Sequence, residues 1–221
     1  MIRDRLRDNG LTLALLALFA GSVIGQAWAG WSADNHDRTL HGLSALGLAS
    51  YLTSGACLSA LFENWESEFL QMSAYVVLTA YLVQRGSVES RDPDKPAPQD
   101  RDPALDAGRP DAPGPVRAGR LARAAYSHSL GLALTALFAA CFVLHWLNSA
   151  REANDDALIH GEAPAGLVAH LGDARFWFES FQNWQSEFLS TAVLIVLAIV
   201  LRERQSPESK PVGAPHGQTG E

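Results

Sequence analysis

The sequence has few cysteines and no concentrated positive charge. Its two cysteines, Cys57 and Cys141, are too few for a disulfide framework, so we expect two unpaired thiols that act as small apolar side chains. Lys and Arg number 17 against 24 Asp and Glu, which gives a formal net charge of −7 without any basic patch. This balance gives no indication of a nucleic-acid partner.

Short motifs of familiar enzymes and metal sites are also absent from the sequence. It has no H-x-x-x-H or C-x-x-C spacing, no nucleophile elbow, no phosphate loop and no cofactor fingerprint. These absences argue against an enzyme, a cofactor and a bound metal ion.

Long apolar runs are what the sequence does contain. Residues 11–29 and 130–147 approach the roughly 20 residues that cross a bilayer, and residues 69–83 and 188–201 are shorter but carry no charge. We therefore predict an all-α membrane protein with four transmembrane helices. The spans are expected at about residues 10–30, 66–85, 127–148 and 185–204.

The first apolar run also has the outline of a secretory signal peptide. Three arginines precede it, and Ala-Trp-Ala at 27–29 resembles a cleavage site. The run is longer than the roughly 7–15 residues of a signal core, and a similar series of residues recurs at 130–139 inside the chain. We expect this segment to remain as a span.

A ten-residue motif occurs twice, as FENWESEFLQ at 62–71 and FQNWQSEFLS at 181–190. The copies are 119 residues apart, and the same offset relates His41-Gly42 to His160-Gly161. We therefore predict two copies of one unit, at residues 10–90 and 129–209. Because each copy contains two spans, both copies enter the membrane from the same side, and the repeats are expected to be parallel.

The predicted repeats occupy residues 1–85 and 121–204, separated by a linker with almost no large apolar side chains. The linker 86–120 holds seven of the eleven prolines, and it and the tail 205–221 are expected to be disordered. Most arginines near span ends fall on one side, which predicts a multi-pass inner-membrane protein with both termini in the cytoplasm.

Each predicted outer loop should form a short helix ahead of the motif. We expect these helices near residues 43–52 and 163–171, followed by an N-cap at Thr53 or Ser54 and at Asp173. From there one helix is expected to continue through the motif to Arg85 or Arg204.

Polar side chains at the start of these spans are the candidate functional residues. A Glu at this depth usually faces a helix bundle or a water-filled cavity and has a partner, for which Arg38 and the two histidines are candidates. The predicted polar cluster contains Asn64, Glu68, Asn183, Glu187, His41 and His160.

Three interpretations of this cluster remain open. The polar side chains could brace the helices; they could form a path or binding site for an ion, a proton or a small solute on a pseudo-two-fold axis; or they could bind a metal. The metal interpretation would use His41, His160, Glu68, Glu187, Asp37 and Asp156.

All six tryptophans map to outer span ends or outer loops, where indole rings favour the membrane–water interface. The predicted interface anchors are Trp28, Trp31, Trp65, Trp146, Trp177 and Trp184. The expected partners are the lipid bilayer and a small ion or solute, and the sequence is compatible with a homo-oligomer.

NGLTL at 9–13, FENWESEFLQ at 62–71 and FWFESFQNWQSEFL at 176–189 together resemble a bacterial family of uncharacterised membrane proteins, catalogued as domain of unknown function 6766. The resemblance covers nearly the whole chain except the linker and tail, and it implies an integral inner-membrane protein without an assigned activity. We predict a membrane protein that binds or passes a small ion, proton or solute; the alternative is a structural or envelope-maintenance protein.

Overall fold

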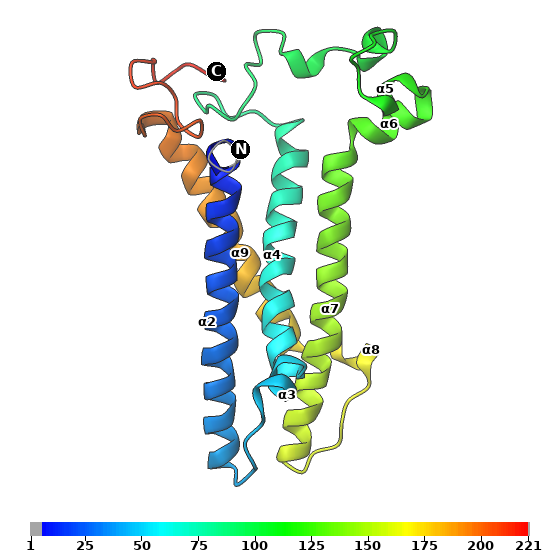
Figure 1. Cartoon of the computed structure of the whole chain (residues 1–221), viewed down its shortest axis with the longest axis vertical. Coiled ribbons are helices and arrows are strands. Elements are labelled where there is room, and N and C mark those ends of the chain that lie inside the picture. Colours follow the sequence, from blue (N-terminus) through cyan, green and yellow to red (C-terminus); the bar gives the residue numbers. More distant parts are fainter. Residues whose placement is uncertain (1–5, 221) are drawn as a thin grey trace. The chain divides into compact units, whose positions relative to one another are not determined.

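The computed structural model describes residues 6–220, and every regular element among them is a helix (Figure 1). The chain divides into two compact units, one of residues 1–62 and 144–176 and one of residues 63–143 and 177–221. The divisions fall inside helices α4 (Gly55–Thr79), α7 (Ser129–Ile159) and α9 (Ala174–Val200). The predicted all-α class is confirmed for the described residues.

Helix α2 (Gly10–Leu40) ends in a turn that depends on glycine. Gly42 has a φ of 71°, in the left-handed region that favours glycine, and the N–H of Leu43 donates to the carbonyl of Arg38 at 2.8 Å. Helix α7 ends in the same way. Gly161 has a φ of 75° there, and the N–H of Glu162 donates to the carbonyl of Ala157 at 2.8 Å.

Two asparagine side chains fold the following loops back onto these helices. Asn35 Oδ1 accepts from Leu46 N–H at 2.6 Å, and Asn35 Nδ2 donates to the Leu46 carbonyl at 3.1 Å. Asn154 makes the same two bonds with Ala165, at 2.8 and 3.2 Å. Helices α2 and α7 thus extend to residues 40 and 159, past the predicted span ends at residues 30 and 148.

Short helices α3 (Leu48–Leu52) and α8 (Leu167–His170) precede α4 and α9, as predicted. Ser54 Oγ accepts from Cys57 N–H at 3.2 Å, and Asp173 Oδ1 accepts from Arg175 N–H at 2.8 Å. These bonds satisfy N–H groups that have no partner within the helix. The predicted caps at Ser54 and Asp173 are confirmed.

Helices α4 and α9 end before the predicted residues 85 and 204. Ser90 Oγ accepts from Gln84 N–H at 3.0 Å, and Ser209 Oγ accepts from Glu203 N–H at 2.9 Å. A hydroxyl thus takes the backbone N–H that a further helical turn would use, and the chain turns away.

Among residues 6–220, three helices are long and apolar enough to cross a membrane: α2, α7 and α9. Helix α4, which carries Glu63, Glu66 and Glu68, is not one of them. Many apolar side chains of α2 are exposed, including Leu11 at 77% and Ile24 at 70%, as expected for a surface in contact with lipid. The chain is a membrane protein.

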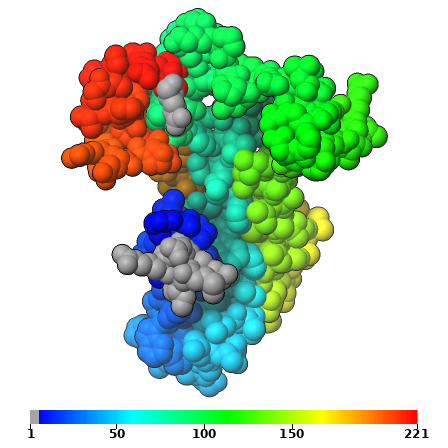
Figure 2. Space-filling view, turned by 45° about the horizontal axis from the view of Figure 1, so that its top comes forward, coloured from blue at the N-terminus to red at the C-terminus, as the bar shows by residue number. Residues whose placement is uncertain are grey.

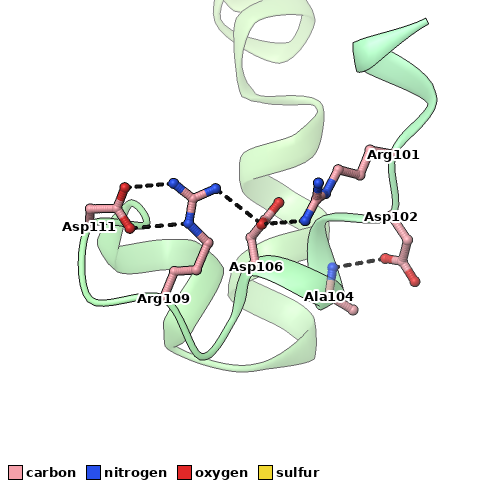
Figure 3. A network of polar contacts seen from close by, with 6 residues as sticks. All are labelled: Arg101, Asp102, Ala104, Asp106, Arg109 and Asp111. Atoms are coloured by element: carbon pink, nitrogen blue, oxygen red, sulfur yellow. Dashed lines mark hydrogen bonds and ion pairs between the residues drawn. The ribbon is translucent and has the colours of Figure 1, made fainter.

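The segment between α4 and α7 contains four short helical elements and a chain of surface ion pairs. These elements are η1 (Pro98–Asp100), η2 (Pro103–Asp106), α5 (Gly114–Arg117) and α6 (Arg120–Ser127). Asp106 lies between Arg101 and Arg109, at 3.0 and 3.4 Å, and Arg109 also pairs with Asp111 at 2.6 Å (Figure 3). Exposed ion pairs contribute at most about 1 kcal/mol each to stability, which does not by itself order a segment. Disorder of residues 86–120 therefore stays a prediction.

The C-terminal tail lies against the segment that follows α4 (Figure 2). Lys210 is 1% exposed, and its Nζ donates to the carbonyls of Gly86, His216 and Gln218 at 2.6, 2.7 and 3.1 Å. Three acceptors offset the loss of water around the buried ammonium group. Disorder of residues 205–221 stays a prediction, and Lys210 makes the contacts that hold the tail in this arrangement.

Glu89 and Glu208 make this tail contact sensitive to pH. Burial, together with the hydrogen bond to Glu208 and the negative charge of Glu208, raises the pKa of Glu89 to about 7 from 4.5. A carboxyl whose pKa is raised in the docked state favours docking fully below pH 4.5, and this contribution is lost as the pH rises through about 7.

We therefore expect limited proteolysis of the tail to accelerate as the pH rises through 7. The Glu89→Gln variant keeps a hydrogen-bond donor without a charge. Cleavage of its tail should therefore accelerate less across this pH range than cleavage in the exposed Glu203→Gln control. Equal pH dependence in the two variants would contradict the assignment to Glu89.

Candidate functional site

Side chains of the two motif copies pair with each other within the second unit. Asn183 Nδ2 donates to Glu63 Oε1 and, at 3.2 Å, to the carbonyl of Glu179 in the preceding turn of α9. Trp184 Nε1 donates to Glu66 Oε1 at 2.8 Å. Two acids of α4 therefore accept from two N–H donors of α9, and the helices are joined at the motif.

Aromatic rings surround the bond between Glu66 and Trp184. The Trp184 ring lies 5.3 Å from Phe181, 6.3 Å from Phe138 of α7 and 6.5 Å from Trp177, centroid to centroid. Glu66 itself is fully buried, at 0% exposure. A carboxyl group withdrawn from water in this way is costly unless it is hydrogen-bonded.

The two glutamates shared by the motif copies, Glu68 and Glu187, lie on stretches of α4 and α9 that are bonded to each other on either side of them, through Glu66 with Trp184 and Gln71 with Thr191. Glu187 is half-buried and Glu68 is exposed. Two negative charges at close range near an apolar segment are unfavourable unless a proton or a cation lies with them. That the two side chains belong to one polar cluster stays a prediction.

A cavity of about 410 Å³ lies between α4 and α9, toward the C-terminal ends of the two helices. Gln71, one turn along α4 from Glu68, donates its Nε2 to Thr191 Oγ1 at 2.6 Å at the border of the cavity. Its other walls are largely apolar and include Leu78, Leu82, Phe188, Ile195 and Val196. Polar side chains thus continue from the glutamate pair into an otherwise apolar cavity.

Tyr75 and Ser73 add hydroxyl groups to this part of α4. Tyr75 lines the cavity, and its Oη is buried without a hydrogen-bond partner among residues 6–220. Ser73 Oγ lies 2.7 Å from Thr135 Oγ1 of α7, whose own hydroxyl donates to the Gly131 carbonyl at 2.8 Å. The Tyr75 hydroxyl is therefore free to bond a ligand or water.

The other two predicted cluster members, His41 and His160, lie in the first unit. Their ring centroids are 5.6 Å apart, with the planes at 74°. Arg38, a predicted partner of Glu68, donates its Nε to the Ser44 carbonyl at 3.0 Å. His41 and His160 thus form a pair within the first unit, while Asn64, Glu68, Asn183 and Glu187 belong to the second, and the single predicted cluster stays a prediction.

The six tryptophans are engaged more specifically than an interface belt requires. Indole N–H groups of Trp31 and Trp146 donate to the carbonyls of Leu46 and Leu167, at 2.7 and 3.0 Å. The ring centroids of Trp28 and Trp31 are 5.4 Å apart, and Trp177 and Trp184 belong to the aromatic group around the bond to Glu66. Trp65 also has an interaction partner. Their role as interface anchors stays a prediction.

Sequence reasoning missed Glu63, Glu66, Gln71 and Thr191. Glu63 and Glu66 occupy motif positions where the second copy has Gln182 and Gln185, so the repeat itself gave no reason to select them. A usable signal was present, because two acids beside Glu68 in a largely apolar helix need hydrogen-bond partners.

Cys57 and Cys141 are free thiols. In the part of the chain that the structure describes, no group of three or more His, Cys, Asp and Glu side chains is placed to hold a metal ion. The six-residue metal site considered from the sequence therefore gains no support from the arrangement of its members.

Comparisons with known proteins identify a family for the chain but no activity. No curated protein and no solved structure matches it significantly. One family model, described as a domain of unknown function, matches residues 2–221, which is nearly the whole chain and includes both motif copies. The chain belongs to this family, the domain of unknown function DUF6766.

Proposed function

We propose that the chain is an inner-membrane protein of four transmembrane helices, built from two parallel repeats. The offset of 119 residues supports the repeat, because it relates the first residues of three helix pairs and also the last residues of α2 and α7. The matching pairs of first residues are Gly10 and Ser129, Leu48 and Leu167, and Gly55 and Ala174. The equivalent bonds of Asn35 and Asn154 support it further.

Helix α4 is the fourth span in this proposal. Its 25 residues extend over about 37 Å at 1.5 Å per residue, which exceeds the roughly 30 Å of a bilayer core. Two of its three glutamates are hydrogen-bonded to α9, which lowers the cost of their burial. Arginines place both termini in the cytoplasm. Those on the inner side are Arg3, Arg5, Arg7, Arg85, Arg91, Arg117, Arg120, Arg123, Arg202 and Arg204.

At the boundary between α4 and α9, the protein binds and passes a proton or another small cation and performs no enzymatic reaction. The placement of Glu68 and Glu187 on bonded stretches of α4 and α9 carries this proposal, since a cation relieves the repulsion between two nearby carboxylates. Gln71 and Thr191 lie one turn further along the two helices and lead to the cavity. The proposed partners are the lipid bilayer and the cation.

The proposal is tested by flux through the full-length protein in liposomes, under a pH gradient and, separately, under Na⁺ and K⁺ gradients. We expect protein-dependent flux in at least one gradient. It should fall by at least about ten-fold, equivalent to about 1.4 kcal/mol, in Glu68→Gln and in Glu187→Gln. Glutamine keeps the size of the side chain and removes the charge that attracts the cation.

Glu203→Gln is the matched control, since Glu203 is exposed and follows α9 in the same unit. Flux should be unchanged in this variant. Absence of flux in every gradient, or equal flux in all three variants, would overturn the proposal.

A structural role is the second candidate, because the bonds of Asn183 and Trp184 join α4 to α9. In that case Glu68→Gln and Glu187→Gln should lower the folded yield in detergent. Preserved yield with lost flux favours the cation site, and lost yield without any wild-type flux favours the structural role.

A further inference from the structure

His41 and His160 are held in the same orientation at the ends of α2 and α7. His41 Nδ1 lies 3.0 Å from the carbonyl oxygen of Asp37, and His160 Nδ1 lies 2.9 Å from that of Asp156. A carbonyl oxygen can only accept a hydrogen bond, so Nδ1 carries the proton in both rings. In the neutral imidazole, Nε2 is then left with its lone pair.

The spacing of the two rings suits a shared metal ion. A tetrahedral ion held at about 2.0–2.1 Å from each nitrogen places the centroids of its two imidazole ligands roughly 5 Å apart. The observed centroid separation is 5.6 Å, with the ring planes inclined at 74°. Both side chains are partly exposed, at 40% and 52%, which leaves room for the rings to turn their Nε2 atoms toward one ion.

The surroundings of each ring also match those of metal-binding histidines. Such histidines usually donate their second N–H to a carbonyl or carboxylate, which fixes the ring and makes the other nitrogen a better ligand. Here each Nδ1 has a carbonyl partner, with the carboxylate of Asp37 or Asp156 at 3.7 or 3.5 Å. These carboxylates also attract a cation to the pair.

We propose that His41 and His160 bind one divalent transition-metal ion of the Zn²⁺, Ni²⁺ and Cu²⁺ class through their Nε2 atoms, with water completing its coordination. Imidazole nitrogen favours these metals over Mg²⁺ and Ca²⁺, which prefer oxygen ligands. The site lies within the first unit and does not rest on the cation path proposed in the second.

Calorimetric titration of the full-length protein with Zn²⁺ tests this site, in detergent and without a polyhistidine tag. We expect one Zn²⁺ per chain and an affinity that falls at least about ten-fold, or about 1.4 kcal/mol, in His41→Gln and in His160→Gln. His36→Gln is the control, because His36 lies in the last turns of α2, directly ahead of His41, and its substitution should leave the affinity unchanged. Absence of Zn²⁺ binding, or binding that survives both substitutions, would overturn the proposal.

A second measurement does not depend on the folding of any variant. Cu²⁺ binds nitrogen sites more tightly than Zn²⁺, and electron paramagnetic resonance resolves how many nitrogens ligate it. Two imidazole nitrogens in the wild-type protein are expected. A spectrum with one nitrogen or none contradicts a shared site.

Discussion

Phe176→Ala is expected to lower the free energy of unfolding by about 3–5 kcal/mol, the usual cost of removing a large buried aromatic ring. Phe176 has no exposed surface, and its ring lies 5.0 Å from His145 and 5.5 Å from His170. His170 Nε2 lies 3.0 Å from Ser149 Oγ, so the ring also supports the bond that ties α8 to α7. Loss of the ring leaves a cavity among these side chains.

Denaturant unfolding in detergent, followed by circular dichroism, measures this effect. Phe178→Ala is the control, because Phe178 lies two residues away on α9 and is 67% exposed. It should change the unfolding free energy by no more than about 0.5 kcal/mol in this assay. An equal loss in the two variants would contradict the assignment of Phe176 to a packed core.

Glu66→Ala is expected to cost about 2–4 kcal/mol, because it removes a buried acceptor and leaves the Trp184 N–H without its bond to Glu66. Glu66→Gln should cost less, since its amide oxygen can still accept from Trp184 Nε1. The order of stability is therefore wild type, then Gln, then Ala. Tryptophan fluorescence should shift most in the Ala variant, where the Trp184 environment changes most.

Gln185 gives this prediction a matched control. It occupies the position of Glu66 in the second motif copy but is exposed, so Gln185→Ala should change the unfolding free energy by no more than about 0.5 kcal/mol. A loss as large as that of Glu66→Ala would show that the motif position matters, rather than the bond to Trp184.

Local sequence signals predicted most of the helical framework. Small polar side chains before an apolar run predicted the caps Ser54 and Asp173, whereas the His-Gly pairs that follow α2 and α7 were used only as matches within the repeat. These features depend on a few neighbouring residues, which a sequence displays directly. The membrane class followed from the apolar runs for the same reason.

Features that depend on contacts between distant residues could not be predicted in the same way. The bonds of Glu63 with Asn183 and Glu66 with Trp184 join positions about 120 residues apart, and they pair unlike positions of the two motifs. The identities between the copies therefore pointed to Asn64, Glu68 and their equivalents and passed over the acids that differ. Likewise, Lys210 is held by three backbone carbonyls, which have no signature in the side-chain sequence.

The convergence of Glu68 and Glu187 is the central claim, and a disulfide tests it directly. Glu68→Cys and Glu187→Cys are introduced together in a Cys57→Ser, Cys141→Ser background, and the protein is mildly oxidised in membranes. Trypsin then cuts the exposed segment between α4 and α7, for example after Arg101.

Glu68→Cys combined with Glu203→Cys, beyond the end of α9, is the control pair. We predict that the two tryptic fragments of the test pair migrate together without reductant and separate when it is added, while those of the control pair separate in both conditions. Fragments of the test pair that separate without reductant would contradict the shared carboxylate site.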